Sequence, residues 1–291
     1  MTMAFSTAPV AARKWYSDGK KMKLTFQISD TRPFINWIYF FHAWGMGGKQ
    51  GVEREQLKAD AEAMLDHWEG RFHTYAVFEL FDANSDGDDL LLGNVRIPML
   101  RQQKVSNQRR PSLCLADFVR PLSSGVKDKV GAFATTVDAD MEHGYRDDVY
   151  RHMLVQVLAE RLAESTAERM HTDVRKHYWG YASGENLPIT DILNERYQGI
   201  RPAVGYPSMP DMSVNFILSD LLDMPQIGIH LTESGMMTPH ASVSGLMFSH
   251  PQATYFDIGK IGEDQLRDYA RRRGLPVELM RRFLASSLIR K

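Results

Sequence analysis

The sequence has a single cysteine, almost no net charge and no long apolar run. Cys114 cannot form an internal disulfide, which fits a reducing compartment. A formal net charge of −1 gives no overall field that would draw the chain to nucleic acid or to a membrane surface. The most apolar stretch, residues 35–44, is far shorter than a membrane span. These absences predict a cytoplasmic protein that binds neither nucleic acid nor membrane.

Familiar metal and phosphate motifs are also missing. The ten histidines form no HExxH pair, and we expect most of them on the surface. Residues 82–93 (DANSDGDDLLLG) begin like a calcium loop, but Gly93 stands where a bidentate carboxylate is needed. A hairpin turn is the better interpretation. Residues 45–51 (GMGGKQG) have no Ser or Thr after the lysine and predict a flexible loop. No catalytic or metal-binding residue is predicted.

Apolar periodicity predicts helices and strands in separate clusters. Helices are expected at residues 51–70, 138–179 (two helices or one long one), 186–197, 214–222, 262–273 and 276–285. Strands are expected at residues 71–81, 90–99, 130–137, 227–232, 242–248 and 254–259. Clustering of this kind indicates an α+β fold, and the absence of a visible linker indicates one domain.

Positive charge is concentrated near the C-terminus. The basic residues there are Arg267, Arg271, Arg272, Arg273, Arg281, Arg282, Arg290 and Lys291. They form either a solvated helix face or a docking patch for an acidic partner protein, because clustered charge steers association. Aromatic residues are sparse among them, which argues against nucleic acid.

Residues 195–211 (ERYQGIRPAVGYPSMPD) form an unusual segment. Three prolines and two glycines predict a stiff, irregular backbone with exposed peptide groups. Arg201 offers a fork for a carboxylate, and Tyr206 offers an aromatic face. Taken alone, the segment is either a ligand-binding loop or a proline-rich connector with a buried tyrosine.

Other motifs favour the binding interpretation. They are CLADFVRP (residues 114–121), RLAESTAERMHTDVRKHYWGYASGENL (161–187), LTESGMMTPHASVSGLMFSHPQATYFDIGKI (231–261) and DQLRDYARRRG (264–274). In this order, around RPAVGYP, they resemble the S-adenosylmethionine-binding reactivation domain of cobalamin-dependent methionine synthase. The resemblance implies a leading segment at residues 1–32 and an activation-type domain at 33–291. It also implies a C-shaped single α+β domain with a central twisted antiparallel sheet and flanking helices.

The same resemblance implies a function. Such a domain binds S-adenosylmethionine and docks on a cobalamin-carrying module. There inert cob(II)alamin takes an electron from a flavodoxin-like or other reductase and is methylated from S-adenosylmethionine. We expect no catalysis by the chain alone, and we expect the cobalamin module in trans. Three alternatives remain: a small-molecule methyltransferase, a binding module without chemistry, and a reactivator of another corrinoid protein.

Several residues match ligand contacts of the family. Arg201 matches the arginine that holds the methionine carboxylate. Ala203 and neighbours such as Gly205 would meet the adenine through main-chain groups, and Tyr206 would face the sulfonium and the corrin. A second aromatic contact is matched by Tyr255 and Phe256.

Acidic and substituted positions complete the expected site. Glu164 and Glu195 match acidic positions near the ligand, although Glu164 is equally well explained as a surface helix residue with an ion-pair partner. Asn36 stands where the family usually has an aspartate on the ligand's amino group. Since charge-assisted hydrogen bonds are about twice as strong as neutral ones, we predict weaker S-adenosylmethionine binding. Thr238 and His240 replace a tryptophan and a glycine and would alter the rim of the site.

Overall fold

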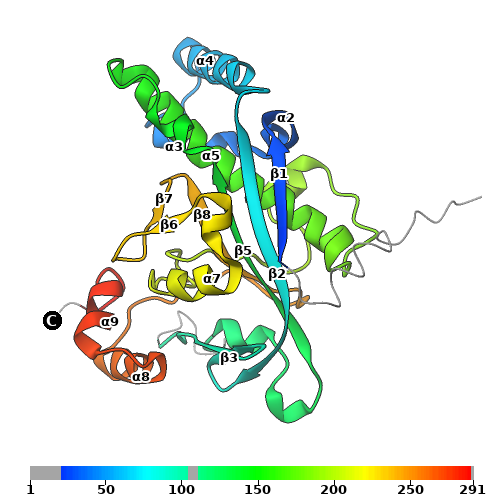
Figure 1. Ribbon diagram of the computed structural model, residues 1–291, viewed down its shortest axis with the longest axis vertical. Coiled ribbons are helices and arrows are strands. Elements are labelled where there is room, and N and C mark those ends of the chain that lie inside the picture. The colour runs from blue at the N-terminus through cyan, green and yellow to red at the C-terminus, as the bar shows by residue number, and fades with distance from the viewer. Residues whose placement is uncertain (1–20, 104–110, 290–291) are drawn as a thin grey trace, which may run out of the picture.

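The computed structural model describes residues 21–103 and 111–289. A curled antiparallel sheet runs through its centre (Figure 1). The sheet follows the order β4-β3-β2-β5-β8, with β1 beside β2. Its strands are β1 (Met22–Gln27), β2 (His73–Asp86), β3 (Asp89–Leu92), β4 (Val95–Pro98), β5 (Asp128–Val137) and β8 (Ser242–Met247). Strands β6 (His230–Leu231) and β7 (Met237–Thr238) form a separate small hairpin.

Four differences separate this sheet from the strands expected in the sequence. Strand β2 is longer than the predicted 71–81, and β1 was not predicted. The strand predicted at 90–99 is two strands, because the chain turns at Gly93, whose φ is +56°. Residues 254–259 form no strand; three of them, Tyr255, Phe256 and Asp257, line a cavity instead.

The hairpin interpretation of residues 82–93 is confirmed. Asp86 at the end of β2 pairs with Asp89 at the start of β3, so two residues make the turn. Gly87 occupies the first of these with φ +60°, a conformation that glycine adopts at no steric cost.

Most of the helices lie where periodicity placed them. The flanking helices are α2 (Ile28–Thr31), α3 (Trp37–Ala43), α4 (Val52–Trp68), α5 (Val149–Asp173), α6 (Ile189–Leu193), α7 (Val214–Leu222), α8 (Glu263–Arg273) and α9 (Val277–Phe283). The region predicted helical at 138–179 contains one long helix, α5, which continues into a π-helical turn, Val174–Tyr178. Helix α6 is much shorter than the predicted 186–197.

The two faces of the sheet pack against different helices. Neighbouring residues of a strand point to opposite faces, so Phe78 and Phe133 join the apolar cluster of α5, whereas Val77 joins that of α7. A third cluster, which includes Leu266 and Met280, holds α8 against α9. Helices α3 and α4 lie at one end of the molecule and α8 and α9 at the other (Figure 1). This is the C-shaped α+β architecture that the resemblance implied.

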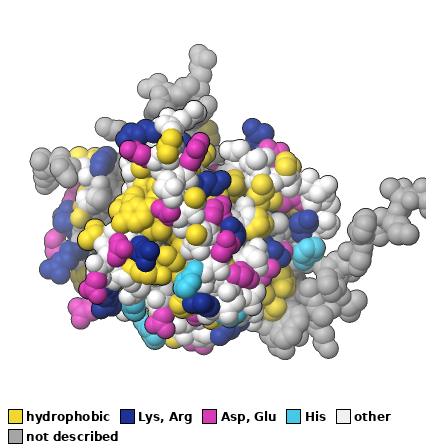
Figure 2. All heavy atoms as spheres, turned by 90° about the horizontal axis from the view of Figure 1, so that it is seen from above, with side chains coloured by type: hydrophobic (Ala, Val, Ile, Leu, Met, Phe, Trp, Pro, Cys, Tyr) yellow, Lys and Arg dark blue, Asp and Glu magenta, His cyan; other side chains and the backbone are white. Residues whose placement is uncertain are grey.

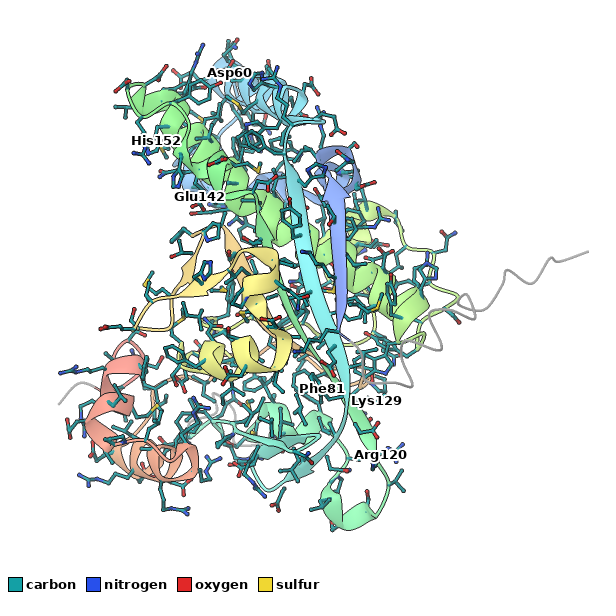
Figure 3. All side chains as sticks on the ribbon, viewed as in Figure 1. Asp60, Phe81, Arg120, Lys129, Glu142 and His152 are labelled. Atoms are coloured by element: carbon teal, nitrogen blue, oxygen red, sulfur yellow. The ribbon has the colours of Figure 1, made fainter. Side chains whose placement is uncertain are left out.

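Polar contacts tie the helical end to the rest of the domain (Figure 3). Tyr150 at the start of α5 donates a hydrogen bond to Asp60 of α4, with 2.6 Å between the oxygens. The Glu142 carboxylate accepts hydrogen bonds from the backbone N–H groups of His240 and Ala241, which joins the turn before α5 to the start of β8.

The arginine-rich helices at the C-terminus are not a wholly solvated face. Arg272 is largely buried and donates to Asp89 and Asp268, and Arg273 lies 3.6 Å from Asp211. The other paired arginines are Arg267 and Arg281, both on Glu263, and Arg271, on Asp268. A docking patch would therefore lose most of its charge to internal ion pairs. Arg290 and Lys291 lie outside the described residues.

Within residues 21–103 and 111–289, no helix is long and apolar enough to span a membrane. The same residues contain no group of three or more His, Cys, Asp or Glu side chains that could hold a metal ion. One histidine departs from the expected surface location, because His171 on α5 is fully buried.

Candidate functional site

A cavity of about 710 Å³ lies between α5 and the loop that starts at Arg201. Its walls come from the turn before α3, from α5, from the segment after α6, from the loop and from residues 255–257. Eight of the nine predicted site residues line it: Asn36, Glu164, Glu195, Arg201, Ala203, Tyr206, Tyr255 and Phe256. The fold thus gathers residues that are widely separated in the sequence.

The loop is attached to the edge of the sheet. Val204 N–H donates to Ser244 O (2.9 Å) and Leu246 N–H donates to Pro202 O (3.1 Å), so the loop extends the sheet beyond β8. Gly245 of β8 permits this approach, since a Cβ there would lie 2.2 Å from Pro202 O. Because the peptide groups on either side of Ala203 turn toward β8, those of Ala203 itself point away from that strand, and its carbonyl accepts from Tyr206 N–H (3.3 Å).

Gly205 is the one predicted residue that does not line the cavity. Its φ is +88°, and its N–H donates to Met209 O (2.8 Å). A Cβ at this position would lie 2.8 Å from the Met212 sulfur. Gly205 therefore makes the turn that shapes the loop, which requires the left-handed conformation natural to glycine.

Arg201 stands at the inner wall of the cavity, with a side chain only 10% exposed. Its backbone N–H donates to Tyr255 Oη (2.9 Å), and its Nη2 donates to Glu168 Oε2 (2.9 Å). Burial disfavours the charge, but the surrounding groups, with Glu168 the largest contributor, together outweigh that effect and raise the pKa of Arg201. The guanidinium is therefore a fixed cation. Its Nε–H has no hydrogen-bond partner among the described residues, so one donor remains for a ligand.

Behind Arg201 lies a second arginine that the sequence analysis did not identify. Arg175, fully buried, comes from the π-helical turn, an irregularity often found at functional sites. It donates to both oxygens of Glu185 (3.0 and 2.7 Å), bonds to His171 Nδ1 (3.0 Å) and stacks on the Tyr197 ring at 3.8 Å. These contacts satisfy its charge within the protein.

The sequence contains a spacing pattern that could have revealed a row of ionisable residues beside the cavity, here called the buried polar row. Glu164, Glu168, His171 and Arg175 follow one another at three- or four-residue intervals, so they share one face of α5 and its π-helical extension. Three of the four are buried. Ionisable residues at core positions of an otherwise apolar helix are costly unless they are paired, and they therefore indicate a polar site inside the fold.

The mouth of the cavity combines an aromatic ring with carboxylates. Tyr206, 50% exposed, donates from Oη to Glu164 Oε1 (2.6 Å), so Glu164 belongs to the cavity rather than to a remote helix surface. Partial burial and the Glu164 charge raise the pKa of Tyr206, which keeps the phenol protonated. Removal of water from around Glu195 raises the pKa of its carboxyl, and the Arg201 charge opposes that shift. Two carboxylates near one opening favour a cationic ligand.

Two aromatic residues, Tyr255 and Phe256, line the cavity together with Asn36. Burial raises the pKa of Tyr255 to about 12, so its hydroxyl remains available to the Arg201 backbone. Phe256 follows it along the wall. Asn36 Oδ1 accepts a hydrogen bond from Ile38 N–H (3.1 Å) and caps α3. An aspartate would make the same cap, because both residues are strongly preferred there.

The two substitutions predicted at the rim lie outside the cavity wall. Neither Thr238 nor His240 lines the cavity. Thr238 lies in β7 and precedes Pro239 through a cis peptide bond. His240 Nδ1 lies 3.3 Å from Glu160 Oε1 on α5.

The fold and the cavity define an α+β domain whose cavity presents an arginine and carboxylates, a combination suited to a small ligand with both anionic and cationic groups. The chain belongs to a known family of such domains: the family model described as the activation domain of vitamin B12-dependent methionine synthase matches residues 27–274. A solved crystal structure of the MetH reactivation domain bound to AdoHcy is also similar, with a TM-score of 0.88 and 37% sequence identity. That match covers 100% of this chain and 95% of the other. The predicted family and fold class are confirmed.

Proposed function

We propose that this chain binds S-adenosylmethionine in the cavity and docks on a cobalamin-carrying module of methionine synthase, where it supports reductive methylation of cob(II)alamin. The observation that carries the proposal is Arg201, which lines the cavity and has a buried Nε–H donor without a partner among the described residues. A ligand with a carboxylate supplies the missing acceptor. The related domain bound to AdoHcy, which differs from S-adenosylmethionine by one methyl group, supports the same assignment.

The polar groups of the ligand have matching partners in the cavity. Arg201 would hold the carboxylate, and Asn36 Oδ1 would accept from the amino group. Glu164 and Glu195 would favour the positive charge of the sulfonium. The peptide groups of Ala203 would meet the adenine edge. S-Adenosylmethionine supplies an electrophilic methyl group, and the residues of this chain bind and orient it.

Apolar side chains around the cavity support docking on a partner protein. Tyr206 and Tyr39 line the cavity and remain exposed. Hydrophobic side chains also gather on the face shown in Figure 2, at the end of the molecule formed by α3, α4 and α5. Exposed apolar residues on these helices are Ile38, Tyr39, Val52, Val149, Tyr150 and Met153. Side chains of both charges surround them (Figure 2), an arrangement common in protein interfaces.

Two measurements test the proposal. Calorimetric titration with S-adenosylmethionine tests the ligand. Formation of methylcobalamin, followed by absorbance, tests the reaction in a mixture with a cobalamin-loaded methionine synthase module and a flavodoxin or another one-electron reductase. We expect saturable ligand binding and methylation that depends on this chain. Absence of binding would refute the ligand, and binding without methylation would refute the docking role.

A binding module without chemistry is the second candidate. The observation that favours it is Asn36, an uncharged residue where the family usually has an aspartate. Such a module would bind S-adenosylmethionine but would not associate with the cobalamin-loaded protein. Co-sedimentation of the two proteins with the ligand present separates the candidates.

A further inference from the structure

Glu168 occupies a central position in the buried polar row, between Arg201 and Arg175. It lies on α5 one turn after Glu164, with its side chain 9% exposed. Its Oε2 accepts from Arg201 Nη2 at 2.9 Å, and its Oε1 lies 3.9 Å from Arg175 Nη1 without a hydrogen bond. Within the described residues, the Glu168 carboxylate is therefore hydrogen-bonded only to the cavity arginine.

We propose that Glu168 is a positioning residue for ligand recognition: it holds Arg201 at Nη2 so that the neighbouring, unpaired Nε–H of the guanidinium can be given to a ligand carboxylate. The inference rests on the proposed function and assigns a role to a residue in that same site. Glu168 contributes a single anchoring bond at Nη2. The neighbouring Nε–H, on the same edge of the planar guanidinium as Nη2, stays free of protein partners within the described residues.

Competing carboxylates make such an anchor necessary. Glu164 and Glu195 line the same cavity and act electrostatically on Arg201. If Glu168 lost its charge, the buried guanidinium would be drawn toward these two residues, since a buried cation needs a counter-charge. The arginine would then cross the cavity and occupy the place of the ligand carboxylate. The Glu185 carboxylate would not compensate, because both of its oxygens are already bonded to Arg175.

The test compares two ligands that differ in the amino-acid portion. S-Adenosylmethionine carries the carboxylate, and 5′-methylthioadenosine lacks it while keeping the adenosine and the sulfur. We expect Glu168→Gln to lower the affinity for S-adenosylmethionine about tenfold, the effect of weakening one charge-assisted hydrogen bond. We expect the affinity for 5′-methylthioadenosine to change less than about twofold, because that ligand does not use Arg201.

Asp89→Asn is the matched control. Asp89 is also a buried carboxylate between two arginines, Arg96 and Arg272, but it lies on β3 and does not line the cavity. Its replacement should lower stability and leave both affinities within about twofold of the wild type. Glu168→Asp gives a second measurement that does not remove the charge. It shortens the side chain by one methylene and should weaken only the binding of the carboxylate ligand.

The outcomes separate the two proposals. If Glu168→Gln lowered the affinity for both ligands equally, its role would be merely structural. Unchanged or tighter S-adenosylmethionine binding would also overturn the inference. In the background of Arg201→Ala, Glu168→Gln should cause no further loss, because the two side chains act as one unit; an additive loss would contradict the positioning role. A wild-type protein that binds neither ligand would overturn the proposed function, and this inference with it.

Discussion

Arg272 near the C-terminus and Arg201 at the cavity are both largely shielded from water, yet their guanidinium groups are used differently. All three nitrogens of Arg272 are bonded: Nε to Asp268 (2.7 Å), Nη1 to Asp89, and Nη2 to Met99 O (2.9 Å). Within the described residues, the Arg201 guanidinium bonds through Nη2 alone, and its Nε is buried without a partner. Arg272 joins parts of the fold, whereas Arg201 retains an unsatisfied donor beside the cavity.

The surroundings of the two arginines differ in their number of unsatisfied buried polar atoms. Around Arg201, the unbonded buried atoms include Glu168 Oε1, His171 Nε2 and Tyr197 Oη. The C-terminal cluster has fewer, and Arg273 Nε there still lies 3.6 Å from Asp211. Buried polar groups are normally satisfied, because an unmade bond costs about 1–3 kcal/mol. Unsatisfied atoms concentrated beside a cavity are consistent with the proposed binding site, whereas the C-terminal cluster has two, Gln265 Oε1 and Arg273 Nε, away from that cavity.

The largest expected effect is on stability, and it tests whether Arg272 stabilises the fold. Arg272→Ala should lower the free energy of unfolding by about 2–3 kcal/mol, because buried Asp89 loses a charge-assisted bond and keeps only Arg96. Urea denaturation measures the change. Arg267→Ala is the control, since its side chain is 66% exposed and surface ion pairs contribute about 0–1 kcal/mol. Equal losses in the two variants would contradict a structural role for Arg272.

Arg201→Lys tests whether ligand binding needs the planar guanidinium fork of Arg201. Lysine keeps the positive charge but lacks the planar fork, so it cannot hold Glu168 and a ligand carboxylate at once. We expect the affinity for S-adenosylmethionine to fall about tenfold. Calorimetry would measure it, with Arg272→Lys as the control that retains affinity. An Arg201→Lys protein that binds as tightly as the control would show that the fork is not used.

The pH dependence of stability should distinguish the two regions, because only the cavity side contains a buried histidine. Burial, together with the charges of Arg175 and Arg201, lowers the pKa of His171 well below its usual value near 6.5. The folded protein therefore keeps His171 neutral while the unfolded chain becomes protonated. This contribution to stability is present above about pH 6.5 and is lost as the pH falls toward the folded pKa, by about 1.4 kcal/mol per pH unit.

His171→Gln should remove that contribution, so its unfolding free energy should depend less steeply on pH between about 6.5 and 5. Urea denaturation at several pH values measures the slope. His230→Gln, at an exposed position on β6, is the control that should keep the wild-type slope. Identical slopes in His171→Gln and the wild type would contradict the assignment.

The smallest expected effect concerns Asn36. Asn36→Asp should strengthen S-adenosylmethionine binding about fivefold, because a carboxylate forms a charge-assisted bond with the ligand's amino group. The cap on α3 should survive, since an aspartate accepts from Ile38 N–H equally well. Titration calorimetry measures the gain. Unchanged or weaker binding would show that residue 36 does not contact the amino group.

The sequence predicts elements well where the pattern is local. Strand β5 and helix α7 lie where β-branched residues and helical spacing placed them. Strand β1 was missed although MKLTFQ alternates, because a short strand next to an unassigned segment gives a weak signal. Residues 254–259 have strand-like composition, but tertiary contacts override it: Tyr255 Oη bonds to the Arg201 backbone instead.

The candidate site could be predicted in outline and not in detail. The resemblance identified eight of the cavity residues, yet it did not reveal Glu168 or Arg175, whose roles depend on partners brought together by the fold. The arginine-rich C-terminus could not be interpreted for the same reason. Arg272 and Asp89 are 183 positions apart, and no local pattern links them.

Calorimetric titration of S-adenosylmethionine into the wild type, Arg201→Ala and Arg272→Ala tests the central claim most directly. Each protein would be titrated where circular dichroism shows that it is folded. We predict one ligand per chain for the wild type and for Arg272→Ala, with similar affinities. The affinity of Arg201→Ala for S-adenosylmethionine should be about a hundredfold lower, because the carboxylate contact is removed. Absence of saturable binding to the wild type, or equal binding by the two variants, would contradict the account.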